Sequence, residues 1–209
     1  LISQMSIEEK AGSMFITVIG INEDGSLSES PTFSNIFSFL FPSSSKMLLN
    51  LKMNHFNIMA THKKENMLKW YNNIQKIGEK SRLGIPITIA SDPRHGVSKS
   101  PVSSNTSFFS KWPSALGLGA IGDSSIVREH ANIVRQEYSA IGIKLALGPM
   151  ADVSTEPRWI RVNGTFGEDA NLNAILTSAY IKGLQGDSLD VNSVASMVKH
   201  FPGSGPVDD

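Results

Sequence analysis

The chain has 209 residues, a formal net charge of zero and no cysteine; 40% of its residues are hydrophobic and 18% are charged. This is the composition of an ordinary globular protein, and without long basic or acidic runs it lacks the charge pattern of a nucleic-acid or anionic-membrane binder. Neither a disulfide framework nor a thiolate metal site can form without cysteine, and no apolar run approaches the about 20 residues of a membrane span. Neutral ligands, which are recognised by hydrogen bonds more than by charge, remain open.

The first 45 residues predict a capped helix, a strand and a long loop. The chain opens at Leu1 without an initiator methionine or a visible signal segment, which we interpret as a trimmed or processed start. Residues 6–9 (Ser-Ile-Glu-Glu) form a capping box, so we expect a helix there and then a strand at residues 15–19. Residues 20–45 are rich in Ser, Asn, Gly and Pro and predict a loop with a short helix; this segment carries a phenylalanine cluster at Phe33, Phe37, Phe39 and Phe41.

From residue 55 onwards, predicted strands and helices alternate. Apolar runs indicate strands at residues 55–59, 85–90, 143–147 and 194–200, and helical spacing of apolar residues indicates helices at residues 62–81, 123–141 and 169–184. Each strand is almost continuously apolar, which is typical of parallel strands that are covered by helices.

This alternation predicts an α/β fold, a (β/α)8 TIM-like barrel of which only the first part is present. A dinucleotide-binding sheet is disfavoured because residues 117–120 (Gly-Leu-Gly-Ala) lack a third glycine and follow no strand. About five strands are visible, whereas an eight-stranded barrel typically needs about 250 residues. We therefore expect residues 1–209 to be the N-terminal portion of one barrel domain, with the barrel incomplete.

Polar segments follow three of the predicted strands, at the ends where barrels carry their active sites. The first segment, residues 91–96, contains Asp92, whose carboxylate can accept two hydroxyl groups of a sugar in a bidentate manner. An Asp-Pro turn in which Asp92 caps a neighbouring backbone amide explains the same residues equally well. The residues themselves leave both interpretations open.

The second segment, residues 152–167, holds two arginines around a tryptophan. Arg161 is a candidate binding residue, because a guanidinium is a rigid donor of several hydrogen bonds and the neighbouring Trp159 offers a stacking face. We assign Arg158 instead to an ion pair that fastens the loop, with Glu168 or Asp169 as its expected partner.

The third segment begins with Lys199 and His200 at the end of the last predicted strand. Alternation would point the two side chains to opposite faces, but Pro202 and Gly203 favour a bend that lets both face a pocket. A buried lysine without a partner is costly, which favours a binding role. His130 is interpreted as a satisfied helix residue. No metal-ligand spacing is present, so we expect no metal and no cofactor.

Taken together, these segments resemble glycoside hydrolase family 3, the β-glucosidase family, over nearly the whole chain. The resemblance begins with Met-Ser-Ile-Glu-Glu-Lys at residues 5–10 and includes residues 91–96 and Trp-Pro-Ser-Ala-Leu-Gly-Leu at residues 112–118. Glu-Pro-Arg-Trp-Ile-Arg, Gly-Thr-Phe-Gly-Glu-Asp and Lys-His-Phe-Pro-Gly then follow, from residues 156, 164 and 199. Their occurrence in this order makes the resemblance highly specific.

The resemblance implies a hydrolase of O-glycosidic bonds, β-glucosidase-like or exo-β-glucanase-like, that acts by a retaining double displacement. Asp92 would hold the sugar hydroxyls farthest from the scissile bond, and Arg161, Lys199 and His200 would hold the others. This chain would thus supply the glycone-binding half of the site. In the family the Asp nucleophile lies on a later barrel strand and the acid in a following α/β domain. We therefore expect the C-terminal part of the barrel and the following α/β domain to be partners of this chain. We expect no catalytic residue within residues 1–209.

Two departures from the family pattern bear on the site. Ile160 stands where glycine is common, which would shift the backbone of Arg161, and residues 204–206 (Ser-Gly-Pro) replace a His-Gly-Asp turn, which disfavours the branch that cleaves N-acetylhexosaminides. The expected partner is a β-glycoside or oligosaccharide substrate, with no nucleic acid and no membrane. The compartment stays open, a secreted or periplasmic one being slightly favoured. The alternative function is a non-catalytic carbohydrate-binding or interaction protein derived from the same barrel.

Overall fold

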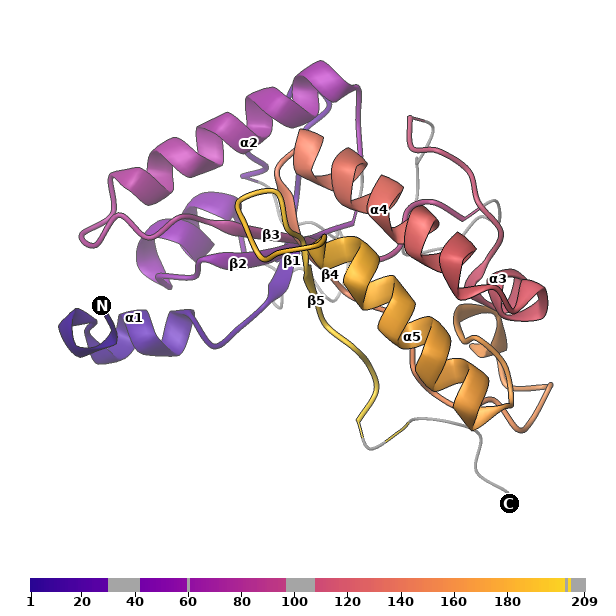
Figure 1. Cartoon of the computed structure of the whole chain (residues 1–209). Coiled ribbons are helices and arrows are strands. Elements are labelled where there is room, and N and C mark those ends of the chain that lie inside the picture. The colour runs from indigo at the N-terminus through magenta and orange to yellow at the C-terminus, as the bar shows by residue number, and fades with distance from the viewer. Residues whose placement is uncertain (30–41, 60, 97–107, 202, 204–209) are drawn as a thin grey trace. The chain divides into compact units, whose positions relative to one another are not determined.

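The computed structural model describes residues 1–29, 42–59, 61–96, 108–201 and 203 (Figure 1). The described chain forms two compact units, the first chiefly of residues 1–92 and the second chiefly of residues 93–96 and 109–203. The phenylalanine cluster predicted within residues 33–41 lies outside the described residues.

The first unit is built on three parallel strands. They are β1 (Thr17–Ile19), β2 (His55–Ile58) and β3 (Thr88–Ser91), with β2 between the other two. Phe56 lies opposite Thr17 on one side and Ile89 on the other, and both of its neighbours run parallel to it. The strands therefore lie where the apolar runs predict them; each is shorter than its run, and β3 ends one residue beyond its run, at Ser91.

Helices of the first unit precede β1, lie between β1 and β2, and connect β2 to β3. They are the short η1 (Ile2–Gln4), α1 (Ile7–Gly12), the π-helical turn η2 (Lys46–Asn50) and α2 (Lys64–Glu79). The capping box is confirmed: the amide of Glu9 donates to the Ser6 hydroxyl and the Glu9 carboxylate accepts from the Ser6 amide. Residues of α2 and of all three strands share one apolar core, comprising Ile19, Phe56, Ile58, Met67, Trp70, Ile74 and Ile89.

Helix α2 is fastened to the segment before β3 by a single carboxamide. Gln75 donates from Nε2 to the carbonyl of Ile87 over 2.7 Å and accepts at Oε1 from the Ile87 amide over 3.0 Å. Both backbone groups of Ile87 are thereby satisfied outside a sheet ladder. This anchor fixes the start of β3 and with it the strand that leads to Asp92.

The described part of the second unit contains two parallel strands, three α-helices and one 3-10 turn. In chain order they are α3 (Ala115–Ile121), α4 (Ser124–Ala140), β4 (Ile143–Ala146), the 3-10 turn η3 (Val162–Gly164), α5 (Ala170–Gln185) and β5 (Ala195–Ser196). Leu145 of β4 lies opposite Ala195 of β5. The prediction of a strand over residues 194–200 is wrong in its extent, because regular pairing stops at Ser196 and resumes only as an isolated bridge at Lys199.

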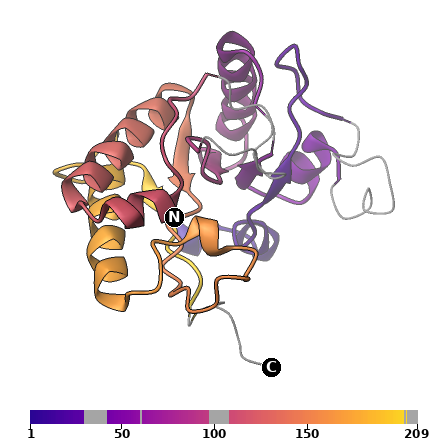
Figure 2. The same ribbon diagram turned by 90° about the vertical axis from the view of Figure 1, so that its right-hand side faces the viewer.

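Helices α4 and α5 lie side by side, as Figures 1 and 2 show. They begin where predicted, since Asp123 accepts from the Ser125 amide and Asp169 from the Leu172 amide as N-caps. A Cβ atom at Gly183 would come within 2.5 Å of both the Ala131 Cβ and the Arg128 carbonyl oxygen. The two helix backbones therefore approach more closely than any residue larger than glycine permits at this position.

Candidate functional site

Asp92 stands at the carboxyl end of β3, directly after Ser91. Its Oδ2 atom accepts a hydrogen bond of 3.1 Å from Nδ2 of Asn57, which belongs to the neighbouring strand β2. Asp92 is half-buried, and this hydrogen bond ties its carboxylate to the neighbouring strand. This geometry is compatible with hydroxyl binding, and the role of Asp92 stays a prediction.

In the second unit, Met150 connects the segments that carry the other three candidates. It forms parallel bridges with both Thr165 and Lys199. The Ala151 amide donates to the Lys199 carbonyl over 2.7 Å, and the Lys199 amide donates to the Pro149 carbonyl over 3.0 Å. These bonds continue the β4–β5 pairing past the regular strands and bring two predicted polar segments together at the carboxyl ends of β4 and β5.

Arg161 reaches the same place from the loop between β4 and α5. Its Nη2 atom lies 3.5 Å from the Met150 sulfur, and the turn that follows is closed by the Gly164 amide, which donates to the Arg161 carbonyl. Gly164 itself lies against Met150, because a Cβ atom there would meet the sulfur at 2.7 Å. Arg161, Lys199 and His200 thus come from segments that converge on Met150, whereas Asp92 belongs to the first unit.

A buried carboxylate that was not among the predicted site residues lies behind His200. Oδ2 of Asp152 is 2.9 Å from Nδ1 of His200, and the Asp152 side chain is fully buried while that of His200 is 29% exposed. The Asp152 main-chain carbonyl also accepts from Nδ2 of Asn173 on α5, at 2.9 Å. The signal in the sequence is that Asp152 is the first charged residue after the strand β4, but its partner lies 48 residues further along the chain.

The loop arginine Arg158 has a different partner from the one predicted. It pairs with Glu156, with Nε 2.9 Å from Oε1 and Nη2 2.7 Å from Oε2, instead of with Glu168 or Asp169. The pair is local because the turn at Glu156 brings the two side chains together; the Arg158 amide also donates to the Glu156 carboxylate. Arg158 is 88% exposed, and its contacts with Glu156 stay within one turn of the loop.

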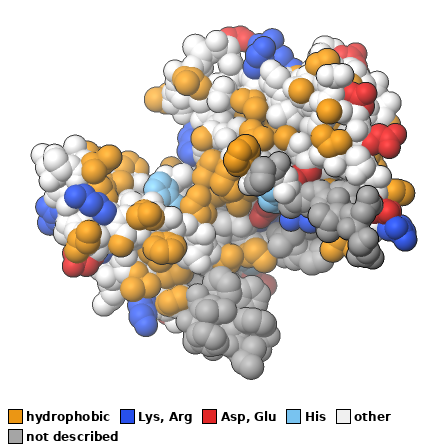
Figure 3. Space-filling model, turned by 90° about the horizontal axis from the view of Figure 1, so that it is seen from below, with side chains coloured by type: hydrophobic (Ala, Val, Ile, Leu, Met, Phe, Trp, Pro, Cys, Tyr) orange, Lys and Arg blue, Asp and Glu red, His pale blue; other side chains and the backbone are white. Residues whose placement is uncertain are grey.

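Large apolar side chains are exposed beside two of the candidates. Ile160, next to Arg161, is 94% exposed, and Phe201, next to His200, is 98% exposed. Hydrophobic side chains are interspersed with charged ones over the face that Figure 3 displays. The candidate polar groups in the second unit therefore have apolar neighbours that are available for contact with a ligand or with another part of the protein.

His95 and His130 belong to a buried aromatic cluster. His95 Nε2 lies 2.7 Å from Oε2 of Glu137, which also accepts from the Ser110 amide. Desolvation lowers the pKa of His95, and the Glu137 charge opposes that shift. His130 packs against Trp112 and Tyr180 with centroid distances of 5.0 and 5.8 Å.

The interpretation of His130 as a satisfied histidine is wrong. It is only 7% exposed, and neither of its ring nitrogens has a hydrogen-bond partner in the part of the chain that the structure describes. Burial, assisted by the neighbouring His95, lowers its pKa to about 4. The imidazole is therefore an uncharged ring among aromatic neighbours.

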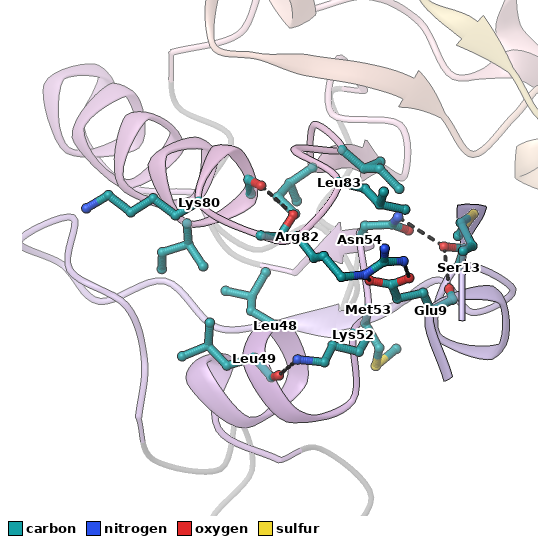
Figure 4. A pocket seen from close by; sticks show the side chains of 16 residues that line it. Glu9, Ser13, Leu48, Leu49, Lys52, Met53, Asn54, Lys80, Arg82 and Leu83 are labelled. Carbon is teal, nitrogen blue, oxygen red and sulfur yellow. Dashed lines mark hydrogen bonds and ion pairs between the residues drawn. The ribbon is translucent and has the colours of Figure 1, made fainter. Parts of the chain in front are cut away.

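The first unit also encloses a pocket of about 240 Å³ at the opposite, amino-terminal ends of its strands (Figure 4). Its wall includes the residues that directly precede β2 and β3, and Arg82 and Glu9 form an ion pair within it. In the view of Figure 4 the side chain of Lys80 extends away from the pocket. Asp92 does not line this pocket, which belongs to the other end of the strands.

Among the described residues, no group of three or more His, Asp or Glu side chains is placed to hold a metal ion. Within the same part of the chain, no helix combines the length and the apolar character that crossing a membrane requires.

A parallel α/β fold with polar loops after its strands is typical of barrel-type domains, and comparison with known proteins gives the family. The model of the glycosyl hydrolase family 3 N-terminal domain matches residues 44–209. The chain belongs to this family, as its motifs predict.

Curated relatives match the chain over its whole length. A protein of Aspergillus flavus named probable beta-glucosidase C is 41% identical over 212 residues, and the periplasmic beta-glucosidase/beta-xylosidase of Dickeya chrysanthemi is 40% identical over 217 residues. In both cases the match covers 100% of this chain and 32% of the relative. The chain thus spans about a third of the length of the curated relatives it matches.

Solved structures agree with the predicted fold class. The beta-glucosidase from Listeria innocua in complex with glucose is 25% identical with a TM-score of 0.66, over 96% of this chain and 26% of that protein. A family 3 beta-N-acetylglucosaminidase from Paenibacillus is 21% identical with a TM-score of 0.72, over 95% of this chain and 34% of that protein; at this identity the similarity concerns the fold alone. The prediction of an α/β barrel-type fold, present in part, is confirmed.

Proposed function

We propose that the protein to which this chain belongs hydrolyses β-glycosides or oligosaccharides, as a β-glucosidase-like or exo-β-glucanase-like enzyme. The observation that carries the proposal is the convergence of Arg161, Lys199 and His200 on Met150 at the carboxyl ends of β4 and β5. Polar groups at that end of a barrel are the usual place for substrate binding. The curated relatives described above, at 40–41% identity, are named as β-glucosidases.

In this proposal the chain supplies the glycone-binding half of the site. The Asp92 carboxylate accepts hydrogen bonds from the hydroxyls farthest from the scissile bond, and Arg161 and Lys199 donate to ring hydroxyls as cations, which makes those bonds stronger than neutral ones. His200 contributes one ring nitrogen. Residues 1–209 then form the N-terminal portion of a single barrel domain, which the C-terminal part of the barrel and a following α/β domain complete.

The chemistry proposed for the whole protein is a retaining double displacement. A carboxylate attacks the anomeric carbon and the bond to the leaving oxygen breaks, while a second carboxylic acid gives its proton to that oxygen. Water then displaces the enzyme carboxylate from the sugar. Both carboxyl groups belong to the parts of the protein that lie outside this chain, so the four residues named here act by binding and orienting the sugar.

Replacement of Asp92 by alanine in the full-length protein tests this function. With p-nitrophenyl β-D-glucopyranoside as substrate, we expect kcat/KM to fall about a hundredfold or more, because Asp92→Ala removes hydrogen bonds made to the sugar in the transition state. The matched control is Asp187→Ala, since Asp187 has a 94% exposed side chain in a surface ion pair with Arg128 and such pairs contribute little.

The outcomes separate the parts of the proposal. Near-normal turnover by the Asp92 variant would overturn the assignment of Asp92. A wild-type protein that binds the glucoside but never cleaves it would favour a non-catalytic carbohydrate-binding protein. Proton NMR of the first product distinguishes the stereochemistry: the β-anomer is expected first, and initial release of the α-anomer contradicts a retaining mechanism.

A further inference from the structure

Asp152 is a fully buried carboxylate that contacts His200, one of the four candidate binding residues. Its Oδ2 atom lies 2.9 Å from Nδ1 of His200, on the inner side of the imidazole. Asp152 is in turn fixed from the helix layer, because its carbonyl accepts from the Asn173 carboxamide in a buried hydrogen bond of 2.9 Å. Asn173 is itself oriented by Thr177, whose hydroxyl donates to Oδ1 of Asn173. The main chain of Asp152 is therefore anchored to α5, while its carboxylate contacts His200.

The chemistry of this contact determines the tautomer of His200. An ionised carboxylate can only accept hydrogen bonds, so the imidazole nitrogen that faces it must carry a proton. In the neutral ring the proton then sits on Nδ1, and Nε2, on the far side of the ring from Asp152, is left as an acceptor. A carboxylate behind a histidine commonly fixes both the tautomer and the orientation of the ring in this way.

We infer that Asp152 is a positioning residue for the glycone site: it holds His200 as the Nδ1–H tautomer, so that Nε2 accepts a hydrogen bond from a sugar hydroxyl. This inference rests on the proposed function for the identity of the ligand. It assigns complementary roles around Met150, with Arg161 and Lys199 as donors and His200 as an acceptor. A hydroxyl group can both donate and accept a hydrogen bond. A site with donors and a fixed acceptor therefore selects sugars whose hydroxyls can donate towards His200 and accept from Arg161 and Lys199.

A double-mutant cycle in the full-length protein distinguishes this role from a merely structural one. Asp152→Asn keeps the shape but offers an NH2 group that can donate to Nδ1 and stabilise the wrong tautomer. With p-nitrophenyl β-D-glucopyranoside we expect kcat/KM to fall about ten- to a hundredfold, the range for loss of a hydrogen bond to a charged group. In the His200→Ala background the same substitution should change kcat/KM less than threefold, because no tautomer remains to be fixed.

Glu137→Gln is the matched control for this cycle. It makes the same chemical change at another histidine–carboxylate contact, 2.7 Å between His95 and Glu137, but without contact to His200. Its effect on kcat/KM should be the same with and without His200→Ala. An Asp152→Asn effect of equal size in both His200 backgrounds would overturn the inference, because a purely structural carboxylate acts independently of the ring.

A second measurement reports on the tautomer without activity. Two-bond 1H–15N correlation spectra of protein labelled with 15N-histidine identify which nitrogen carries the proton, and the His200 signal is assigned by its loss in His200→Gln. We expect Nδ1–H in the wild type and a gain of Nε2–H in Asp152→Asn. An Nε2–H wild type refutes the inference. If the protein neither binds nor cleaves a glycoside but His200 carries its proton on Nδ1, the proposed function fails and the tautomer assignment stands.

Discussion

Helix α3 packs backbone to backbone against the segment that follows Arg161. A Cβ atom placed on Gly119 would lie 2.1 Å from the carbonyl oxygen of Phe166 and 2.8 Å from its carbonyl carbon. Real Cβ atoms essentially never come closer than 3.0 Å to such atoms, so in Gly119→Ala the helix or the segment must move by about 0.9 Å. Because Phe166 is buried and the opposing atoms are backbone, the contact cannot be relieved by a side-chain rotation.

The expected cost follows from two opposing terms. Overpacking of this kind costs about 1–3 kcal/mol, and alanine in place of glycine in a helix is favourable by about 1 kcal/mol, which leaves a net destabilisation of up to about 2 kcal/mol. The upper value corresponds to a melting temperature lower by several degrees for a domain of this size. Since a displacement near 1 Å in a binding site can lower the rate by up to about a hundredfold, we also expect a lower kcat/KM for p-nitrophenyl β-D-glucopyranoside.

Gly117→Ala provides the control within the same helix. Its Cβ atom would first meet the Pro113 ring at 3.0 Å, with no backbone atom in the way, so an adjustment of a few tenths of an ångström suffices. Thermal unfolding and steady-state kinetics of both variants in the full-length protein compare the two positions. If Gly119→Ala melts and turns over like Gly117→Ala, the close approach of α3 does not position the Arg161 segment and the reasoning is refuted.

Two further predictions concern the second unit. The pKa of His130 is lowered from 6.5 to about 4. Between these two values the imidazole is protonated in the unfolded chain but stays neutral in the folded chain. The free energy of unfolding therefore decreases, by on the order of 3 kcal/mol, as the pH falls from 6.5 towards 4. His130→Phe should flatten that pH dependence of the melting temperature, and an unchanged slope between pH 7 and 4.5 would contradict it. Gly183→Ala should lower the melting temperature and speed amide hydrogen exchange in α4 and α5, because its Cβ would lie 2.5 Å from Ala131 and Arg128 atoms; equal exchange in Gly183→Ala and in Ser178→Ala, on the exposed face of α5, would show that the packing relaxes freely.

Local signals made most elements predictable from the sequence. The caps at Ser6, Asp123 and Asp169 mark helix starts that the structure confirms, because each cap is a contact within three residues. Helix α3 was not predicted. Gly117 and Gly119 lower its helix propensity, and the need for glycine at residue 119 arises only from the distant Phe166. Its one local signal is Ser114, which caps the helix by accepting from the Gly117 amide.

The site shows the same division between local and distant information. Strand ends could be located from apolar runs, so the segments that carry Asp92, Arg161, Lys199 and His200 could be chosen. The pairing of the side chains could not be predicted, because the Asp152–His200 contact joins residues that are 48 positions apart in the chain. For Arg158 the predicted partners lie ten or more residues further along the chain, whereas the structure pairs it with Glu156, which a tight turn brings within reach. The end of β5 depended on bonds to Ala146 and Pro149, which no pattern in residues 194–200 reveals.

The pocket at the amino-terminal ends of the first unit's strands has a practical consequence for attaching the protein to a surface. Lys80 is exposed at the end of α2 and extends away from that pocket (Figure 4). The chain contains no cysteine, so Lys80→Cys would give it a single thiol for coupling to a bead or a fluorophore. The tether would leave from the end of α2, whereas Asp92 follows the carboxyl end of β3. Within this unit, the group that carries the label and the group proposed to meet the sugar would then belong to opposite ends of the same strands.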